Sequence, residues 1–198
     1  VRFGQSTLMQ CLAGLDSIDS GNIKIGGIDI TSLNDRDLTR LRREHVGFIF
    51  QHFNLVSTLT AEQNIMLPMK LAKRQVDQEL FNNVVERLGI KSRLSHKPHE
   101  MSGGQQQRVA IARALVAQPT VIFADEPTGN LDSVSSSEVL RFLRDSVDVF
   151  GQTVIMVTHD PIAATYADET ILLADGRITA TLVSPTVEQV VAALQEVE

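Results

Sequence analysis

Two adjacent carboxylates, Asp125 and Glu126, follow a short apolar run at residues 121–124. The run begins soon after Pro119 and ends at the acidic pair, which suits a strand buried on both faces of a parallel sheet. Open α/β sheets bind their ligands at the carboxyl ends of the strands. At such an edge one carboxylate can hold Mg²⁺ while the other orients a water molecule. The pair therefore predicts metal-assisted chemistry at a sheet edge.

A second chemical feature precedes the acidic pair, at residues 101–105, where the sequence reads MSGGQ. Ser102 followed three residues later by Gln105 is a capping-box pattern, so a helix should begin there with its free N–H groups pointing outward. Such a helix end attracts anions. Gly103 and Gly104 carry no Cβ, so a phosphate could approach their backbone closely. The helix end and the acidic pair together indicate parts of a site that binds and splits a nucleoside triphosphate.

Two more polar residues follow predicted strands. Gln51 comes after the apolar run at residues 46–50, and His159 comes soon after the run at residues 153–157. Both runs are short and apolar, and we expect both strands to be buried. Taken alone, Gln51 is best interpreted as a polar strand terminus and His159 as a structural histidine.

Several spaced motifs in one order resemble the ATP-binding subunits of ABC transporters. They are MSGGQ, the strand ending in Asp-Glu, PTGNLD at residues 127–132, and Thr158-His159-Asp160. The wording of these motifs is most similar to the lipoprotein-releasing and macrolide-exporter branch, and the resemblance covers almost the whole chain. It implies an α/β fold of the P-loop NTPase (RecA-like) type, with a parallel sheet core, a β-hairpin at one edge and an inserted α-helical subdomain. The implied single nucleotide-binding domain, residues 1–198, has its core at 1–57 and 118–183, its helical subdomain at 58–117 and a terminal helix at 184–198.

The resemblance also implies roles for individual residues. Mg²⁺ would be held by Ser6, Gln51 and Asp125. The catalytic residues would be Glu126, which polarises water as general base, and His159 and Gln51, which contact the γ-phosphate of ATP. The nucleotide-binding residues would be Gly4, Gln5, Ser6 and Thr7 on the chain's own nucleotide, Ser102, Gly103, Gly104 and Gln105 on the nucleotide of a partner domain, and Asp132, which with Asn130 and Leu131 would cross the interface.

The phosphate loop departs from the family pattern. A complete loop reads G-x-x-x-x-G-K-[ST] and follows a strand. The chain opens Val1-Arg2-Phe3-Gly4-Gln5-Ser6-Thr7, so Gly4 matches the last glycine, Ser6 the Mg²⁺ hydroxyl, and Gln5 stands at the lysine position. We expect either a chain whose beginning has been lost or a naturally degenerate site. Losing a charge-assisted hydrogen bond of ~1.5–3 kcal/mol predicts weak ATP binding.

Composition limits the partners. The 198 residues carry a net charge of −6, which argues against nonspecific nucleic-acid binding, and Cys11 is the single cysteine, which fits a reducing compartment. No apolar run approaches the ~18 residues that span a bilayer, so a membrane role must go through a partner. The resemblance implies a second nucleotide-binding domain in a head-to-tail dimer, a transmembrane permease, and a cytoplasmic position on the inner membrane face.

Local signals predict the remaining elements. Capping residues and glycines predict helices at about residues 6–13, 34–43, 61–73, 76–88, 103–117, 133–150 and 185–197. A two-glycine turn at Gly26-Gly27 predicts a hairpin over residues 23–30, and a strand is expected at residues 170–173 before a turn at Asp175-Gly176. Arg108 and Arg113, on the helix at 103–117, are interpreted as ordinary surface or packing arginines.

Three functional hypotheses remain open on the sequence. The first is an energy-coupling ATPase of a transporter. The second is a catalytically impaired subunit that lends its MSGGQ helix to an intact phosphate loop on another chain. The third, a soluble ABC ATPase of DNA repair or translation, is disfavoured because the chain lacks the long inserts or paired cassettes that such proteins generally carry.

Overall fold

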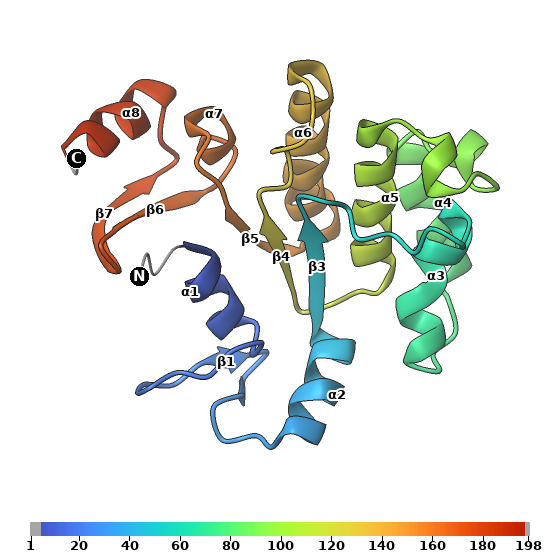
Figure 1. Ribbon diagram of the computed structural model, residues 1–198, viewed down its shortest axis with the longest axis horizontal. Helices are drawn as coiled ribbons and strands as arrows, with labels where there is room; N and C mark the ends of the chain where they lie inside the picture. Colours follow the sequence, from blue (N-terminus) through green and yellow to red (C-terminus); the bar gives the residue numbers. More distant parts are fainter. Residues whose placement is uncertain (1–4, 197–198) are drawn as a thin grey trace.

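The centre of the fold is a parallel three-stranded sheet. A computed structural model describes residues 5–196, with the side chains of residues 5 and 6 outside the description. The sheet has the order β3 (Val46–Phe50), β4 (Val121–Asp125) and β5 (Thr153–Val157), so β4 lies in the middle (Figure 1). Phe50 is in register with Asp125, and Asp125 with Val157. The carboxyl ends of all three strands therefore meet at one edge, as expected for an α/β sheet.

The strands differ in how well they are covered. β4 is buried along nearly its whole length, whereas β5 is exposed or half-buried at every position. Ile155, in the middle of β5, is 37% exposed. The expectation of a buried strand at residues 153–157 is thus wrong within residues 5–196, because β5 pairs there only with β4. Periodicity in the sequence indicates that a strand is apolar but not how many neighbours it has.

A group of helices packs beside β3. It comprises α3 (Ala61–Leu71), α4 (Gln78–Arg87), the short 3-10 turns η1 (Lys91–Arg93) and η2 (Pro98–Glu100), and α5 (Gly103–Val116). Thr60 with Gln63 and Ser102 with Gln105 form the two expected capping boxes. Side chains of α3, α4 and α5 share one hydrophobic core with Ile49 and Ile122 of the sheet. A separate helical subdomain with borders at residues 58 and 117 stays a prediction.

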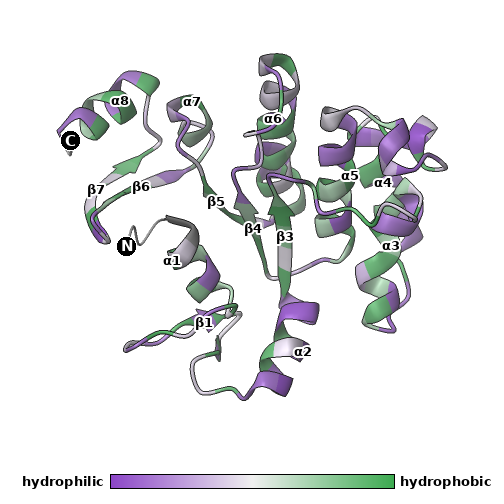
Figure 2. Ribbon diagram, viewed as in Figure 1, coloured by the Kyte–Doolittle hydropathy of each residue, from purple (hydrophilic) through white to green (hydrophobic). Residues whose placement is uncertain are grey.

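The first elements of the chain cover the face of the sheet opposite the core that contains Ile49 and Ile122. They are α1 (Gln5–Leu12), the hairpin strands β1 (Lys24–Ile25) and β2 (Ile28–Asp29), and α2 (Asp35–His45). Gly26 and Gly27 at the hairpin turn both have positive φ, as the predicted two-glycine turn requires. A second core joins Met9, Ile25 and Phe123. Figure 2 shows the hydrophobic strands of the central sheet between more polar elements, of which α2 is strongly hydrophilic.

The rest of the chain forms a long helix and a C-terminal hairpin unit. α6 (Ser133–Phe150) packs against α5 and β5, and α7 (Pro161–Ala164) leads into β6 (Glu169–Ala174), β7 (Arg177–Val183) and α8 (Val187–Gln195). The sequence reading assigned no strand at residues 177–183. Asp175 and Gly176 both have positive φ, and they close an antiparallel hairpin between β6 and β7. An Asp-Gly pair is a strong hairpin signal, and here it joins two strands.

An apolar cavity separates β5 from the β6–β7 hairpin. Its volume is about 510 Å³. Leu8 of α1, Val147 of α6, Val154 of β5 and Ile171 and Ile178 of the hairpin are among the side chains that line it. The cavity lies beside the sparsely covered strand β5, so this end of the sheet is much less tightly packed than the end at β3.

Candidate nucleotide site at the carboxyl edge of the sheet

Glu126 is the most constrained of the predicted site residues. It directly follows β4 and has a φ of 45°, a left-handed conformation that is uncommon for a residue other than glycine. Its N–H donates to the carbonyl of Val157 at 2.9 Å, and its carbonyl accepts from the N–H of Gly129 at 3.0 Å. Backbone strain of this kind persists only where surrounding contacts enforce it. The turn after β4 therefore fixes where this carboxylate lies.

The carboxylate of Glu126 is held by two groups that follow β5. Nδ1 of His159 lies 2.8 Å from Oε1, and the hydroxyl of Thr158 donates to Oε2 at 3.3 Å. A carboxylate can only accept, so Nδ1 carries the proton in this contact. The Glu126 side chain is 19% exposed, whereas that of His159 is 82% exposed. His159 thus closes over a largely shielded carboxylate from the solvent side.

The pairing changes the titration of the histidine. The hydrogen bond to Glu126, together with the negative charge of that residue, raises the pKa of His159 above its ordinary value. An opposite charge favours the protonated imidazole, and burial, which would oppose protonation, is slight at this exposed position. A His159 whose charge depends on Glu126 can respond when another anion arrives at the same edge.

Gln51 lies at the same edge and is bound to the loop that follows Glu126. Its Nε2 donates to Oδ1 of Asn130 at 3.3 Å, and Nδ2 of Asn130 donates to the carbonyl of Gln51 at 3.0 Å. Gly129 makes this crossing possible, because a Cβ there would lie 2.6 Å from Nε2 of Gln51. The predicted role of Asn130 was in a loop that crosses an interface. In this structure its amide binds Gln51 of the same chain.

Asp125 ends β4, between Phe50 and Val157 in the sheet register. It therefore lies at the same edge as Gln51 and Glu126. Among residues 5–196 no group of three or more His, Cys, Asp or Glu side chains is arranged to hold a metal ion by itself. Mg²⁺ is commonly bound by one or two carboxylates together with substrate phosphates and water. The edge suits a Mg²⁺ ion that arrives with a nucleotide.

The N-terminus of α5 has the predicted capping geometry. The N–H of Gln105 donates to the Ser102 hydroxyl at 3.3 Å, and the N–H of Ser102 donates to Oε1 of Gln105 at 3.1 Å. Gly103 is half-buried, but Gly104 is fully buried, and a Cβ at Gly104 would lie 2.8 Å from the hydroxyl oxygen of Ser135. Packing therefore explains the glycine at position 104, because α6 approaches it closely. The sequence did not indicate this approach. Contact of this helix end with a phosphate stays a prediction.

The other predicted nucleotide-binding residues lie at two helix starts. Asp132 caps α6, where its carboxylate accepts from the N–H groups of Val134 and Ser135 at 3.1 and 3.0 Å. These contacts and the Ser135 hydroxyl lower the pKa of Asp132. Thr7 lies in the first turn of α1 and is half-buried. Gly4 and the side chains of Gln5 and Ser6 lie outside the described residues.

Sequence reasoning missed two side chains of α5 that touch this site. Gln107 is completely buried, and its amide lies between the carboxyl end of β3 and the loop after Glu126. Arg113, interpreted as an ordinary arginine, donates to the carbonyls of Asn54 and Phe53 at 2.6 and 3.0 Å. Both acceptors follow Gln51 and have positive φ. The sequence held one signal for Gln107, because it is a polar residue among the apolar positions of this helix.

Comparison with known proteins decides the family. The sequence profile of the ABC transporter family matches residues 3–129, more than half of the chain. The chain belongs to the ABC transporter family. The bacitracin export ATP-binding protein BceA of Halalkalibacterium halodurans is 44% identical over 177 residues, which are 88% of this chain and 70% of that protein. The lipoprotein-releasing system ATP-binding protein LolD of Bacteroides fragilis is 42% identical, over 88% of this chain and 82% of its own.

Longer relatives and solved structures agree with this assignment. The macrolide export ATP-binding/permease protein MacB of Rhodopseudomonas palustris is 47% identical over 96% of this chain but only 29% of its own length. Two dimeric structures of the ATP-binding cassette MJ0796, one of them bound to ADP and Pi, match with TM-scores of 0.79 and 0.80. Both are 36% identical, over 92% of this chain and 82% of theirs. The chain is thus an ABC ATPase cassette, an ATP-binding subunit of the BceA, LolD and MacB type.

Proposed function

We propose that this cassette binds Mg-ATP, hydrolyses it at the carboxyl edge of its sheet, and uses the cycle to drive a membrane permease. The observation that carries the proposal is the contact between Glu126 and His159. Their side chains come from the ends of neighbouring strands and meet at 2.8 Å, beside Gln51 and Asp125. A carboxylate that is fixed by its backbone and partly shielded from water is suited to act as a general base.

Each residue at the edge then has a chemical task. Glu126 takes the proton from the attacking water, and His159, once a γ-phosphate is present, donates its hydrogen bond to that anion. Asp125 and the Ser6 hydroxyl would hold Mg²⁺, with Gln51 beside the ion and the water. The bound ion would supply charge neutralisation for the phosphates. Gly4, Gln5 and Thr7 would surround the phosphates from the start of α1.

The N-terminus of α5 supports a head-to-tail dimer. Its free N–H groups attract an anion, and in the proposed dimer Ser102, Gly103 and Gln105 cover the nucleotide of a second cassette, with Asp132 at the interface. One related cassette, MJ0796, was solved as a dimer in two structures, which supports the arrangement. Closing and reopening of the pair would be transmitted to the permease.

The permease supplies the link to a membrane. None of the helices within residues 5–196 is both long and apolar enough to cross a bilayer. The position on the inner face of the membrane, held there by a permease, is part of the proposal, and it is supported by the similarity to MacB, which is named as an ATP-binding/permease protein. The cargo would be recognised by that partner, and nucleic acid is not part of the proposal.

Gln5 favours a second candidate function. It stands at the position of the phosphate-loop lysine, and glutamine lacks the positive charge that lysine offers to a phosphate. A cassette with weak ATP binding of its own could still lend its α5 N-terminus to an intact site on another chain. This candidate predicts that ATP turnover requires a second, different cassette.

ATP turnover tests both candidates. We would measure it for the chain and for its Gln5→Lys variant, each with and without Glu126→Gln, and with Glu86→Gln as an exposed control on α4. We expect Glu126→Gln to lower turnover by about a hundredfold or more, since it removes the general base, and Glu86→Gln to have no effect. Unchanged turnover in Glu126→Gln would overturn the proposal. Turnover that appears only with Gln5→Lys, or only with another cassette, supports the second candidate.

A further inference from the structure

Gln107 occupies an unusual position for a polar side chain. It lies in α5, one and a half turns after the capping residue Ser102, and has no exposed surface. Ala110, Ile111 and Ala114, which follow it at helical spacing on α5, are also buried, and they are apolar. Burying an amide in such surroundings is costly unless it is hydrogen-bonded. The contacts of Gln107 should therefore explain its presence.

The amide nitrogen of Gln107 joins two separate segments of the chain. Nε2 donates to the carbonyl of Pro127 at 2.5 Å and to the carbonyl of Phe50 at 3.4 Å. Both partners are acceptors, so the amide cannot be turned over without placing its oxygen against two other oxygens. The orientation is therefore fixed by chemistry. Oε1 is buried and makes no hydrogen bond, so the contacts are one-sided.

The two acceptors are the immediate neighbours of the proposed catalytic groups. Phe50 directly precedes Gln51, and Pro127 directly follows Glu126. The two segments are also bound to each other through the reciprocal contacts of Gln51 and Asn130. One buried donor thus lies where the strand end of Gln51 and the turn of Glu126 meet. A displacement of this donor moves both segments.

We propose that Gln107 is a positioning residue that holds Gln51 and Glu126 in one fixed arrangement and ties both to α5. The inference rests on the proposed function, which assigns ATP chemistry to Gln51 and Glu126. The inference also connects two nucleotide sites through α5, because this helix begins at the residues that would cover a partner's nucleotide and contains Gln107. An anion bound at that helix end would move the same helix that positions the catalytic groups of this chain.

Arg113 strengthens the tie between α5 and the Gln51 segment. It lies six positions further along α5, and its guanidinium holds the carbonyls of Phe53 and Asn54. Burial lowers the pKa of Arg113, although guanidinium groups remain protonated in proteins. The segment that follows β3 is therefore attached to α5 at two places, whereas the Glu126 turn is attached through Gln107. Gln107 is the contact that the two segments share.

Hydrogen exchange in the intact chain tests the positioning without any nucleotide. We would compare Gln107→Met, which keeps the length and removes the donor, with Gln106→Met. Gln106 also donates its amide to a carbonyl, that of Met101 at 3.1 Å, which belongs to neither segment. The reporters are the N–H groups of Phe53, which donates to Phe50, and of Gly129, which donates to Glu126. We expect Gln107→Met to speed exchange of both by about tenfold, since hydrogen bonds near two buried carbonyls weaken together.

Three outcomes would overturn the inference. They are acceleration of only one segment, equal acceleration in Gln106→Met, and an equal rise in exchange throughout β4 and α6, which marks a general loss of stability. A Gln107→Glu variant adds a rescue test, because a protonated carboxyl can donate to a carbonyl and an ionised one cannot. After correction for the intrinsic pH dependence of amide exchange, protection of both reporters should rise as the pH is lowered in Gln107→Glu and should stay unchanged in Gln107→Met.

Turnover separates this inference from the proposed function. The side chain of Gln107 is hydrogen-bonded to Phe50 and Pro127, neither of which would bind nucleotide, so Gln107→Met should lower kcat by about tenfold and leave KM for ATP within about twofold. Equal changes in kcat for Gln106→Met would count against the inference. If the parent chain hydrolyses no ATP, the proposed function fails, and the exchange experiment still decides whether Gln107 positions the two segments.

Discussion

The two outer strands of the central sheet have different surroundings. β3 is covered by α5 and α2, and Ile49 in its centre is completely buried. β5 borders the cavity of about 510 Å³, and Ile155 in its centre is 37% exposed. Figure 1 shows the helices α3, α4 and α5 gathered beside β3, while the β6–β7 hairpin and α8 lie beyond β5.

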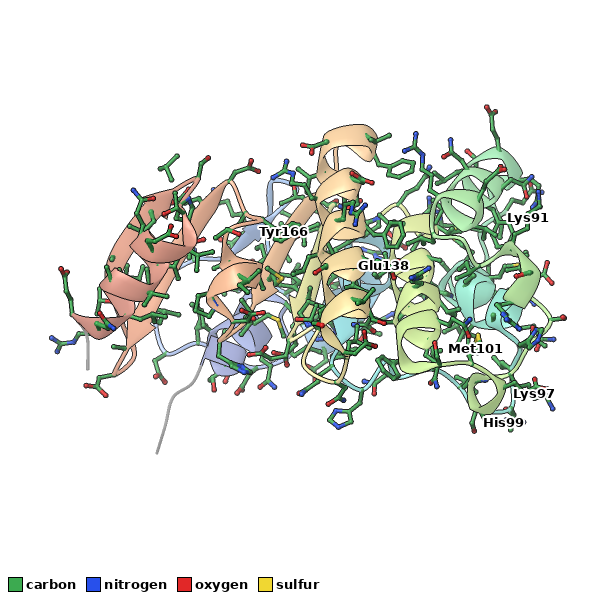
Figure 3. All side chains as sticks on the ribbon, turned by 90° about the horizontal axis from the view of Figure 1, so that it is seen from above. Lys91, Lys97, His99, Met101, Glu138 and Tyr166 are labelled. Carbon is green, nitrogen blue, oxygen red and sulfur yellow. The ribbon has the colours of Figure 1, made fainter. Side chains whose placement is uncertain are left out.

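The difference also divides the candidate site. Gln51 and the turn of Glu126 belong to the closely packed end and are tied to α5 by Gln107 and Arg113. His159 follows β5, at the loosely packed end, and α1 lines the cavity. Figure 3 shows how α5 and α6 lie side by side, with Glu138 of α6 near α5, where it pairs with Arg108. The candidate site thus joins a turn that is hydrogen-bonded to α5 with a histidine that follows the sparsely covered strand β5.

The largest expected effect compares the same residue type on the two outer strands. Ile49→Ala removes a buried side chain from the shared core and should lower the free energy of unfolding by about 3–4 kcal/mol. Ile155→Ala removes a side chain that is already partly in water, and its cost should stay below about 1.5 kcal/mol. Urea unfolding followed by far-ultraviolet circular dichroism measures both, since the chain has no tryptophan. Equal costs would mean that the two ends of the sheet are packed alike.

A second comparison adds volume instead of removing it, on a single helix. Val139 of α6 is completely buried in the core shared with α5, whereas Val147, further along the helix, lines the cavity. Val139→Phe overpacks the core and should cost about 1–3 kcal/mol. Val147→Phe can extend into the cavity and should change stability by less than about 0.5 kcal/mol or raise it. A cost for Val147→Phe as large as that for Val139→Phe would show that the cavity is not available.

The same contrast explains what the sequence could predict. The capping boxes at Thr60 and Ser102 depend on residues three positions apart, so they are visible in the sequence and are confirmed. The placement of Gln51, Glu126 and His159 at one edge followed from strand ends in a parallel sheet. Their roles stay predictions. The exposure of β5 and the contacts of Gln107 depend on which elements lie next to them, and no local pattern carries that information.

The strand β7 was missed for a different reason. Its residues, 177–183, read RITATLV, which alternates polar and apolar side chains, but they lack the continuous apolar run that identified β3 and β4. The Asp175-Gly176 turn was recognised, but a turn before a helix and a turn within a hairpin share the same residues. A hairpin at the edge of the molecule is stabilised by its partner strand more than by burial of its own side chains.

The smallest expected effect lies at the boundary between the two ends, in the contact of His159 with Glu126. Because the carboxylate raises the pKa of His159, the contribution of this contact to the free energy of unfolding is complete below the ordinary histidine pKa. It is lost as the pH rises through the raised value. The contribution to stability should be small, since the His159 side chain is 82% exposed and solvent screens the pair.

Nuclear magnetic resonance titration of the imidazole proton signals measures this contact directly. In Glu126→Gln the amide carries no charge, so the pKa of His159 should fall toward the ordinary value. When His159 loses its charge at high pH, Glu126 keeps the hydrogen bond from the Thr158 hydroxyl and the backbone hydrogen bonds of its turn. An unchanged pKa of His159 in Glu126→Gln would show that the 2.8 Å contact is not maintained in solution, and the pairing of these two strand ends would not hold.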